Sequence, residues 1–254
     1  MNADEYLSHC YSIPHTLPSL PLADESFLFK WHEAQGSDAI AFLSNLYGRD
    51  LTLLDDIKIS FAQTLAGKLP VVDTNNHDDF TLLVAFLMNR KTTKPLPKTI
   101  NAFTLPTKID GKSHRILLLN RAPYSNVAAE DLSLAEDDWL IKSRKIRLRH
   151  ESAHYETLRL FGSMTNHALD EIVADTLGQI AAFGNFSAAR QKLFFGLDGD
   201  KCSGRLQFYC QKVCDSERPK VYAAVTKVLD KINVVGKSEL EILCELAGKS
   251  LPGA

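Results

Sequence analysis

The stretch RKIRLRHESAHYETLRLFG, residues 144–162, has apolar residues at helical spacing and a closing glycine, so it is predicted to be a helix. It contains the pattern HExxH, formed by His150, Glu151 and His154. Positions i and i+4 share one face of a helix, so the two imidazoles point the same way and can bind one Zn²⁺. Glu151 is then placed to take a proton from an attacking water molecule. The stretch therefore predicts one zinc ion per chain.

A second group of charged residues follows on the next predicted helix. Glu171 comes 17 residues after His154 and shares a helix face with Asp175. A hydrolytic zinc site needs three protein ligands and one open position, so Glu171 is the expected third ligand. Asp175 is expected to hydrogen-bond a ligand histidine and hold its tautomer. Asp170 and His167 are rival third ligands, and a merely charged helix face is the simpler alternative.

The order HExxH, short turn, ExxxD resembles the gluzincin metallopeptidases, of which thermolysin is the best-known type. The resemblance implies three zinc ligands: His150, His154 and Glu171. It also implies that Glu151 is the general base and that Asp175 is the orienting carboxylate. The resemblance covers roughly residues 100–184.

The thermolysin type also supplies a donor that stabilises the oxyanion, from a position beyond the third ligand. Oxyanion stabilisation is a large contribution to catalysis, so an active enzyme needs such a group. The sequence offers four candidates and does not choose among them: Arg205, Tyr209, Arg218 and Tyr222.

A further resemblance lies upstream, in the run Asn-Ala-Phe-Thr-Leu-Pro at residues 101–106. It is similar to the Asn-Ala-Phe strand that precedes HExxH in the membrane-bound CAAX-protease family and its soluble relatives. In that family the strand borders the cleft and can pair with an extended substrate. The resemblance implies an edge strand in which Asn101, Ala102 and Phe103 are candidates for backbone pairing with a peptide.

The remaining chain is predicted to be helices, then a small sheet, then more helices. Two short apolar runs, 100–106 and 114–120, flank Asp110-Gly111, which is a strong hairpin turn signal. Helices are expected at about 134–161 and 168–183, with two or three more within 188–248. Ser238 and Glu241 form an expected capping box for the last helix.

The N-terminal part is predicted to be irregular and then helical. Three prolines in the first 25 residues indicate an irregular arm. Helical spacing predicts one helix ending at Gly48 and a second, over residues 53–65, ending at Gly67. A polar loop over residues 70–79 and a Pro- and Lys-rich linker over residues 91–98 are expected. Between them, residues 80–89 fit either a helix or a buried strand.

The predicted fold class is therefore α+β, zincin-like and mostly helical, with a small sheet packed on the HExxH helix. The expected division is an N-terminal arm and helical region, residues 1–95, and a zincin-like metal-binding domain, residues 96–254. The arm is also a candidate regulator that folds over the cleft.

Composition limits the partners of the chain. The 254 residues include 29 Lys plus Arg against 31 Asp plus Glu, a net charge of −2, which does not suggest nucleic acid or an anionic membrane as partner. No apolar run approaches the roughly 20 residues of a membrane helix. The first residues lack the pattern of a signal peptide, and five cysteines do not form a disulfide framework. We therefore expect a cytoplasmic protein with reduced thiols.

The favoured function is hydrolysis of peptide bonds in a peptide or protein substrate by a zinc-activated water molecule. The main alternative is a catalytically inactive zincin-like scaffold that acts as an interaction or regulatory protein. A zinc hydrolase of non-peptide bonds, and two helix histidines without any metal, also remain open. An open fourth position on the metal would favour the enzyme, and a site capped by His167 or Asp170 would favour the scaffold. The sequence does not indicate the oligomeric state.

Overall fold

In the computed structural model, which describes residues 1–16, 30–91 and 94–251, the chain divides into two compact units. Unit 1 combines residues 1–18 with residues 123–254, and unit 2 consists of residues 19–122. Helices and strands occur in both, which makes the structure α+β. The expected domain boundary at residues 95–96 falls inside unit 2, so the strand pair predicted near residues 100–120 groups with the preceding segments.

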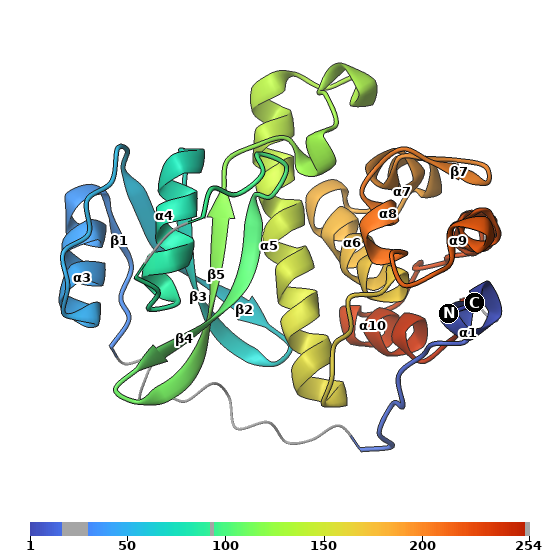
Figure 1. The fold of residues 1–254 in the computed structure, drawn as a ribbon, viewed down its shortest axis with the longest axis horizontal. Coiled ribbons are helices and arrows are strands. Elements are labelled where there is room, and N and C mark those ends of the chain that lie inside the picture. Colours follow the sequence, from blue (N-terminus) through green and yellow to red (C-terminus); the bar gives the residue numbers. More distant parts are fainter. Residues whose placement is uncertain (17–29, 92–93, 252–254) are drawn as a thin grey trace. The chain divides into compact units, whose positions relative to one another are not determined.

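Unit 2 is built on a five-stranded sheet (Figure 1). Its strands are β1 (Ala34–Gln35), β2 (Ile57–Thr64), β3 (Gly67–Thr74), β4 (Ala102–Ile109) and β5 (Lys112–Asn120). They lie in the order β1-β2-β3-β5-β4, and all neighbours are antiparallel except the parallel pair β3 and β5. The strand that contains Ala102 and Phe103 is therefore an edge strand.

The hairpin between β4 and β5 is confirmed. Ile109 pairs with Lys112, and the two residues between them have left-handed backbones, with φ of 51° at Asp110 and 76° at Gly111. Positive φ at both central positions is the requirement of a type I′ turn, which an Asp-Gly pair meets at low cost.

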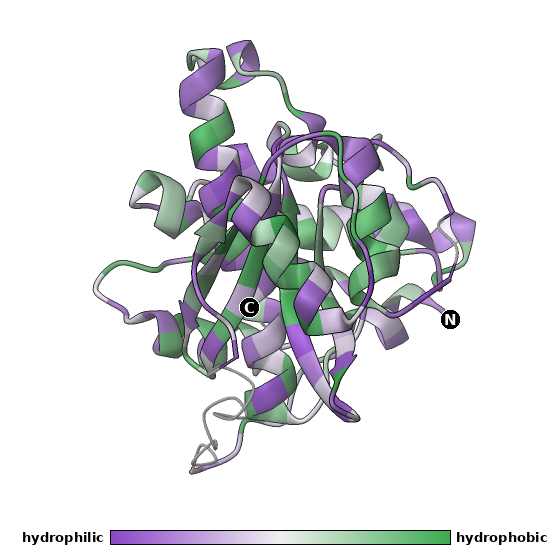
Figure 2. Cartoon of the chain, turned by 90° about the vertical axis from the view of Figure 1, so that its left-hand side faces the viewer, coloured by the Kyte–Doolittle hydropathy of each residue, from purple (hydrophilic) through white to green (hydrophobic). Residues whose placement is uncertain are grey.

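Two helices, α3 (Gly36–Tyr47) and α4 (His77–Leu87), cover one face of the sheet. Leu43 of α3 and Phe80 of α4 are fully buried in the same apolar cluster as Ile59 and Leu118 of the sheet. Residues 116–119 of β5 are all buried, so both faces of this strand are covered. The central strands accordingly carry hydrophobic residues along much of their length (Figure 2).

Two predictions for this part of the chain are wrong. Residues 57–64, predicted as part of a helix over residues 53–65, form strand β2, and the predicted loop 70–79 begins with the second half of β3 and ends in the first turn of α4. Buried Ile57 and Ile59 alternate with exposed Lys58, which is the period of a strand, and pairing with β3 fixes it. The open alternative for residues 80–89 resolves as helix α4.

Unit 1 is mainly helical (Figure 1). Its helices are α1 (Ala3–Leu7), α5 (Glu136–Phe161), α6 (Ala168–Phe183), α7 (Ala188–Phe195), α8 (Leu206–Tyr209), α9 (Arg218–Leu229) and α10 (Glu239–Ala247). Single turns of 3₁₀ helix lie at Tyr124–Asn126, Glu130–Leu132 and Asp215–Glu217, and a two-stranded ribbon joins β6 (Leu197–Asp198) to β7 (Lys201–Cys202). The long helix α5 packs beside α6.

The ends of these helices follow the sequence signals. Gly162, whose φ of 77° suits glycine, caps the C-terminus of α5, and α6 lies between its caps His167 and Gly184. The predicted helices 134–161 and 168–183 are confirmed, as is the capping box of Ser238 and Glu241. The arm predicted to be irregular contains helix α1, while residues 17–25 of that prediction lie outside the described residues.

All five cysteines are free thiols, in agreement with the expected absence of a disulfide framework. Among the described residues, no helix has the length and apolar character that crossing a membrane requires.

Candidate metal centre

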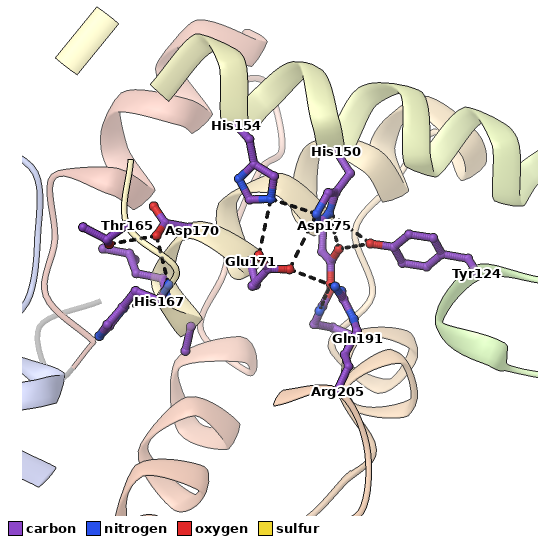
Figure 3. A network of polar contacts seen from close by, with 12 residues as sticks. Tyr124, His150, His154, Thr165, His167, Asp170, Glu171, Asp175, Gln191 and Arg205 are labelled. Carbon is purple, nitrogen blue, oxygen red and sulfur yellow. Dashed lines mark hydrogen bonds and ion pairs between the residues drawn. The ribbon is translucent and has the colours of Figure 1, made fainter. Parts of the chain in front are cut away.

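Helices α5 and α6 bring together the three residues expected to bind zinc (Figure 3). His150 and His154 lie one turn apart on α5, and Glu171 lies in the first turn of α6. The potential ligand atoms of the three side chains all lie within 4.8 Å of one another. Within residues 1–16, 30–91 and 94–251, this is the one such group that suits a metal ion.

The two imidazoles meet through their Nε2 atoms, which are 2.9 Å apart. Nε2 of His154 lies 3.3 Å from Oε1 of Glu171, and Nε2 of His150 lies 3.5 Å from Oε2. The side chains of His150 and His154 keep 8% and 10% of their surface exposed, whereas Glu171 keeps 3%. The donor atoms thus converge in a place that solvent reaches only at its edge.

Asp175 fixes the far side of the His150 ring. Its Oδ1 lies 2.8 Å from Nδ1 of His150, so Nδ1 carries the proton and Nε2 presents its lone pair to the cluster. Asp175 lies one turn after Glu171 on α6 and is completely buried. This is the place that the sequence predicted for it.

Four donors surround the carboxylate of Asp175. Tyr124 and His150 hydrogen-bond its Oδ1, and Gln191 and Arg205 donate to its Oδ2. Burial alone would raise the pKa of Asp175, but the charge of Arg205 and the bond from His150 outweigh burial and hold it well below the ordinary value. The carboxylate is therefore ionised and unable to rotate.

Charge holds the cluster together without a metal. Burial raises the pKa of Glu171, but the two neighbouring imidazoles and the charge of Arg205 prevail and lower it to about 2. Burial lowers the pKa of His154, and its bond to Glu171 then raises it to about 9. Arg205 donates from Nη1 to Oε2 of Glu171 at 2.8 Å, which leaves Oε1 facing His154.

These residues fit a zinc ion. Two imidazole nitrogens and one carboxylate oxygen are the ligand set of a hydrolytic zinc site. The lone pair of His150 is directed by Asp175, and Oε1 of Glu171 is the oxygen that Arg205 does not occupy. Three electron-pair donors facing one point require a cation between them, which is a proton on His154 or a metal ion.

The rival third ligands serve other purposes. His167 caps α6: its Nδ1 accepts from the backbone of Leu169 at 3.0 Å, and its Nε2 donates to the carbonyl of Tyr6. Asp170 accepts a hydrogen bond from Tyr11 and another from the His167 backbone at 3.1 Å. Neither residue belongs to the group of three, and both bind the N-terminal segment instead.

The oxyanion candidates separate into two pairs. Arg205 and Tyr209, on either end of the short helix α8, both hydrogen-bond Glu171. Arg218 pairs with Asp215 at 2.8 Å, and Tyr222 is buried on α9. The structure thus brings Arg205 and Tyr209 to the cluster.

The strand candidates lie in the other unit. Ala102 and Phe103 begin β4, and Asn101 precedes them with its side chain donating to the carbonyl of Lys98. The Asn101 side chain also accepts from Asn120 at 2.7 Å. Their pairing with a substrate stays a prediction.

Two residues of the cluster were not found from the sequence. Tyr124 lies 26 residues before His150 in a 3₁₀ turn, and Gln191 lies 16 residues after Asp175 on α7. No helical spacing links either residue to the motif, so only the packing of three separate elements reveals them.

The chain matches the model of a protein family of unknown function, DUF7005, over residues 33–109 and 111–241. The matched residues include His150, His154 and Glu171 and the side chains that hydrogen-bond them. No similar protein is found among curated proteins or solved structures.

Proposed function

The chain belongs to the DUF7005 family, whose function is unknown, and we propose that it is a zinc-dependent metallopeptidase of zincin-like fold. One zinc ion would be held by His150, His154 and Glu171. The substrate would be a peptide or protein, cleaved by water at a peptide bond, and the location would be the cytoplasm, where free thiols persist.

The observation that carries the proposal is the convergence of the three donor atoms. His150 and Glu171 are 21 residues apart in the sequence and lie on two different helices. The ligand atoms of all three side chains nevertheless lie within 4.8 Å of one another. The orienting bond from Asp175 to Nδ1 of His150 adds the feature that zinc-binding histidines generally have.

Each residue would have a distinct task in the reaction. When bound, zinc would lower the pKa of a water molecule and polarise the scissile carbonyl. Glu151 would take the proton of the attacking water and pass it to the leaving amine. Tyr209 is the better donor for the oxyanion, because Arg205 already binds both Glu171 and Asp175.

The test is metal content and peptide cleavage in matched variants. We expect about one zinc per chain by inductively coupled plasma mass spectrometry, and its loss in His154→Ala. Glu151→Gln should retain the zinc and lose cleavage of a complex peptide library by a factor of about 10²–10⁴, the usual contribution of a general base. Glu136→Gln, at an exposed glutamate on the same helix, is the control and should change neither value.

Two results would contradict the proposal. One is a wild-type chain that takes up no zinc and gains no thermal stability when zinc is added. The other is a zinc-loaded Glu151→Gln variant that cleaves peptides as fast as the wild type. Zinc binding without cleavage of any peptide would point to a different scissile bond.

A second function, a catalytically inactive scaffold, is favoured by one observation. Arg205 and protonated His154 together balance the charges of Glu171 and Asp175, so the cluster is neutral without a metal. On this alternative, the network would only stabilise unit 1, and unit 1 would act as an interaction or regulatory module. Unchanged stability of the wild type on zinc addition would favour it.

A further inference from the structure

Tyr124 meets the metal cluster on the side opposite to the converging donor atoms (Figure 3). Its hydroxyl lies 2.9 Å from Nδ1 of His150 and donates to Oδ1 of Asp175. The side chain is 95% buried, so water does not compete for either contact. The three atoms form a closed triangle, since Nδ1 and Oδ1 are themselves 2.8 Å apart.

The ring of Tyr124 is held on every side. Its backbone N–H donates to Oγ of Ser143 at 2.9 Å, which ties the 3₁₀ turn to α5. Phe194 packs edge-on against the ring at 5.1 Å, and the guanidinium groups of Arg147 and Arg205 lie over it at 5.6 and 5.2 Å. The hydroxyl position is therefore fixed by packing and does not depend on His150.

The direction of the hydrogen bonds follows from the acceptor. The Tyr124 hydroxyl donates its proton to Oδ1 of Asp175, whose carboxylate is paired with Arg205. The tyrosine oxygen then has only lone pairs to offer Nδ1 of His150. Both neighbours of Nδ1 are acceptors, and this places the imidazole proton on Nδ1 and the lone pair on Nε2.

The other carboxylate oxygen is anchored separately. Gln191 and Arg205 donate to Oδ2, and Gln191 is in turn held by Gln179, whose side-chain nitrogen donates to it at 2.7 Å. Asp175 cannot turn to give His150 a different partner. Tyr124 then limits how far the His150 ring can tilt. An N–H group that faces two acceptors is held more tightly than one that faces a single acceptor.

We propose that Tyr124 is a positioning residue of the metal centre, whose hydroxyl fixes the tautomer and the tilt of His150. The inference rests on the zinc site proposed above. Partners of this kind behind a metal ligand typically change metal affinity by about 10–100-fold when removed.

The test compares Tyr124→Phe with Tyr47→Phe and the wild type. Tyr47 is a matched control, because its hydroxyl also makes one short hydrogen bond, at 2.7 Å to Thr107, but lies in unit 2. Zinc affinity is measured by competition with a chromophoric chelator, and the thermal midpoint of each metal-free protein is recorded alongside. We expect a 10–100-fold loss of zinc affinity in Tyr124→Phe and less than a twofold change in Tyr47→Phe.

A second measurement does not require that Tyr124→Phe folds. Long-range ¹H–¹⁵N spectra of metal-free wild-type protein, labelled at histidine, report which ring nitrogen carries the proton. We expect a downfield proton on Nδ1 of His150 with a through-space contact to the Tyr124 ring.

The outcomes separate the two proposals. Equal zinc affinity of Tyr124→Phe and the wild type would overturn the role of Tyr124 and leave the metal site standing. A proton on Nε2 of His150 would overturn it as well. A wild-type chain that binds no zinc would instead overturn the proposed function.

Discussion

His167 is the N-cap residue of helix α6, a position where serine or aspartate is more usual. Its ring must stay neutral for this task, because Nδ1 accepts from Leu169 and Nε2 donates to Tyr6. The ring also stacks on Tyr6 with a centroid distance of 3.9 Å. Burial, and then the nearby His9, lower the pKa of His167 to about 4.

This shift predicts a stability that depends on pH. The unfolded chain takes up a proton at His167 below its ordinary pKa of 6.5, whereas the folded chain does so only near 4. The contribution is fully present above pH 6.5 and is lost as the pH falls towards 4. At about 1.4 kcal/mol per pKa unit, the loss is about 3 kcal/mol. Urea unfolding of metal-free protein between pH 7 and 4 measures it.

The control for this prediction is His167→Asn, since asparagine caps a helix without titrating in this range. The slope of unfolding free energy against pH should be flatter in the variant. Equal slopes in both proteins would show that His167 is not responsible.

The site was predictable at the residues that repeat with helical spacing. His150 and His154 share a face of one helix, and Glu171 and Asp175 share a face of the next, so each pair is visible in the sequence. Tyr124 is different: it reaches the cluster from a 3₁₀ turn, and its position depends on how α5 and α7 pack. No spacing rule describes such a contact.

At the scale of elements, the site depends on the close approach of α5 and α6. Gly178 faces Ile146 across the helix pair, and a Cβ atom on Gly178 would lie 3.0 Å from both the carbonyl oxygen and Cγ2 of Ile146. Gly178 lies two turns after Glu171, and Ile146 lies one turn before His150. The glycine therefore sets the distance between the two ligand-bearing helices.

We predict that Gly178→Ala destabilises the protein, although alanine is normally the better helix former by about 1 kcal/mol. The backbone of Ile146 cannot move away cheaply, so the expected loss is about 1–3 kcal/mol. Zinc affinity should fall as well, because the added methyl group would push α5 away from α6. Denaturant unfolding and chelator competition measure the two effects, and a stabilised variant would contradict the argument.

Helices and strands were predictable from the sequence where their apolar residues follow a single period. The 26-residue α5 and the 16-residue α6 have long periodic patterns and clear C-terminal glycines. The sequence predicts a helix where strand β2 lies, because the apolar residues at 57 and 61 are also four apart. The partner strand β3 decides between the two periods, and a single sequence does not show which segments will pair.

At the scale of the whole molecule, the first residues of the chain complete unit 1. The Tyr6 hydroxyl donates to the carbonyl of Tyr209, and the Tyr11 backbone donates to the carbonyl of Ala247 at 2.8 Å. Tyr6, Leu7 and Tyr11 are all buried. The first part of the arm predicted to be irregular thus belongs to the apolar packing of this unit.

Removal of residues 1–11 should lower the free energy of unfolding by several kcal/mol. Each buried side chain of this size contributes about 1.5–3 kcal/mol, and Asp170 and His167 would lose their partners Tyr11 and Tyr6. Urea unfolding of the shortened chain, compared with a Ser8→Ala variant as a mild control, checks this. Unchanged stability would show that the segment is dispensable and would revive its interpretation as a detachable regulator.

Because residues 19–122 form a unit of their own, unit 1 is discontinuous along the chain. The carbonyl of Leu7 accepts from the backbone of Leu251, so the first and last described parts of unit 1 meet. A ribosome makes Leu7 long before Leu251, and unit 2 is complete in between. Unit 2 is therefore free to fold during translation, while the N-terminal segment must wait until Leu251 has been made. The closing contact of unit 1 can therefore form only after unit 2 has been synthesised.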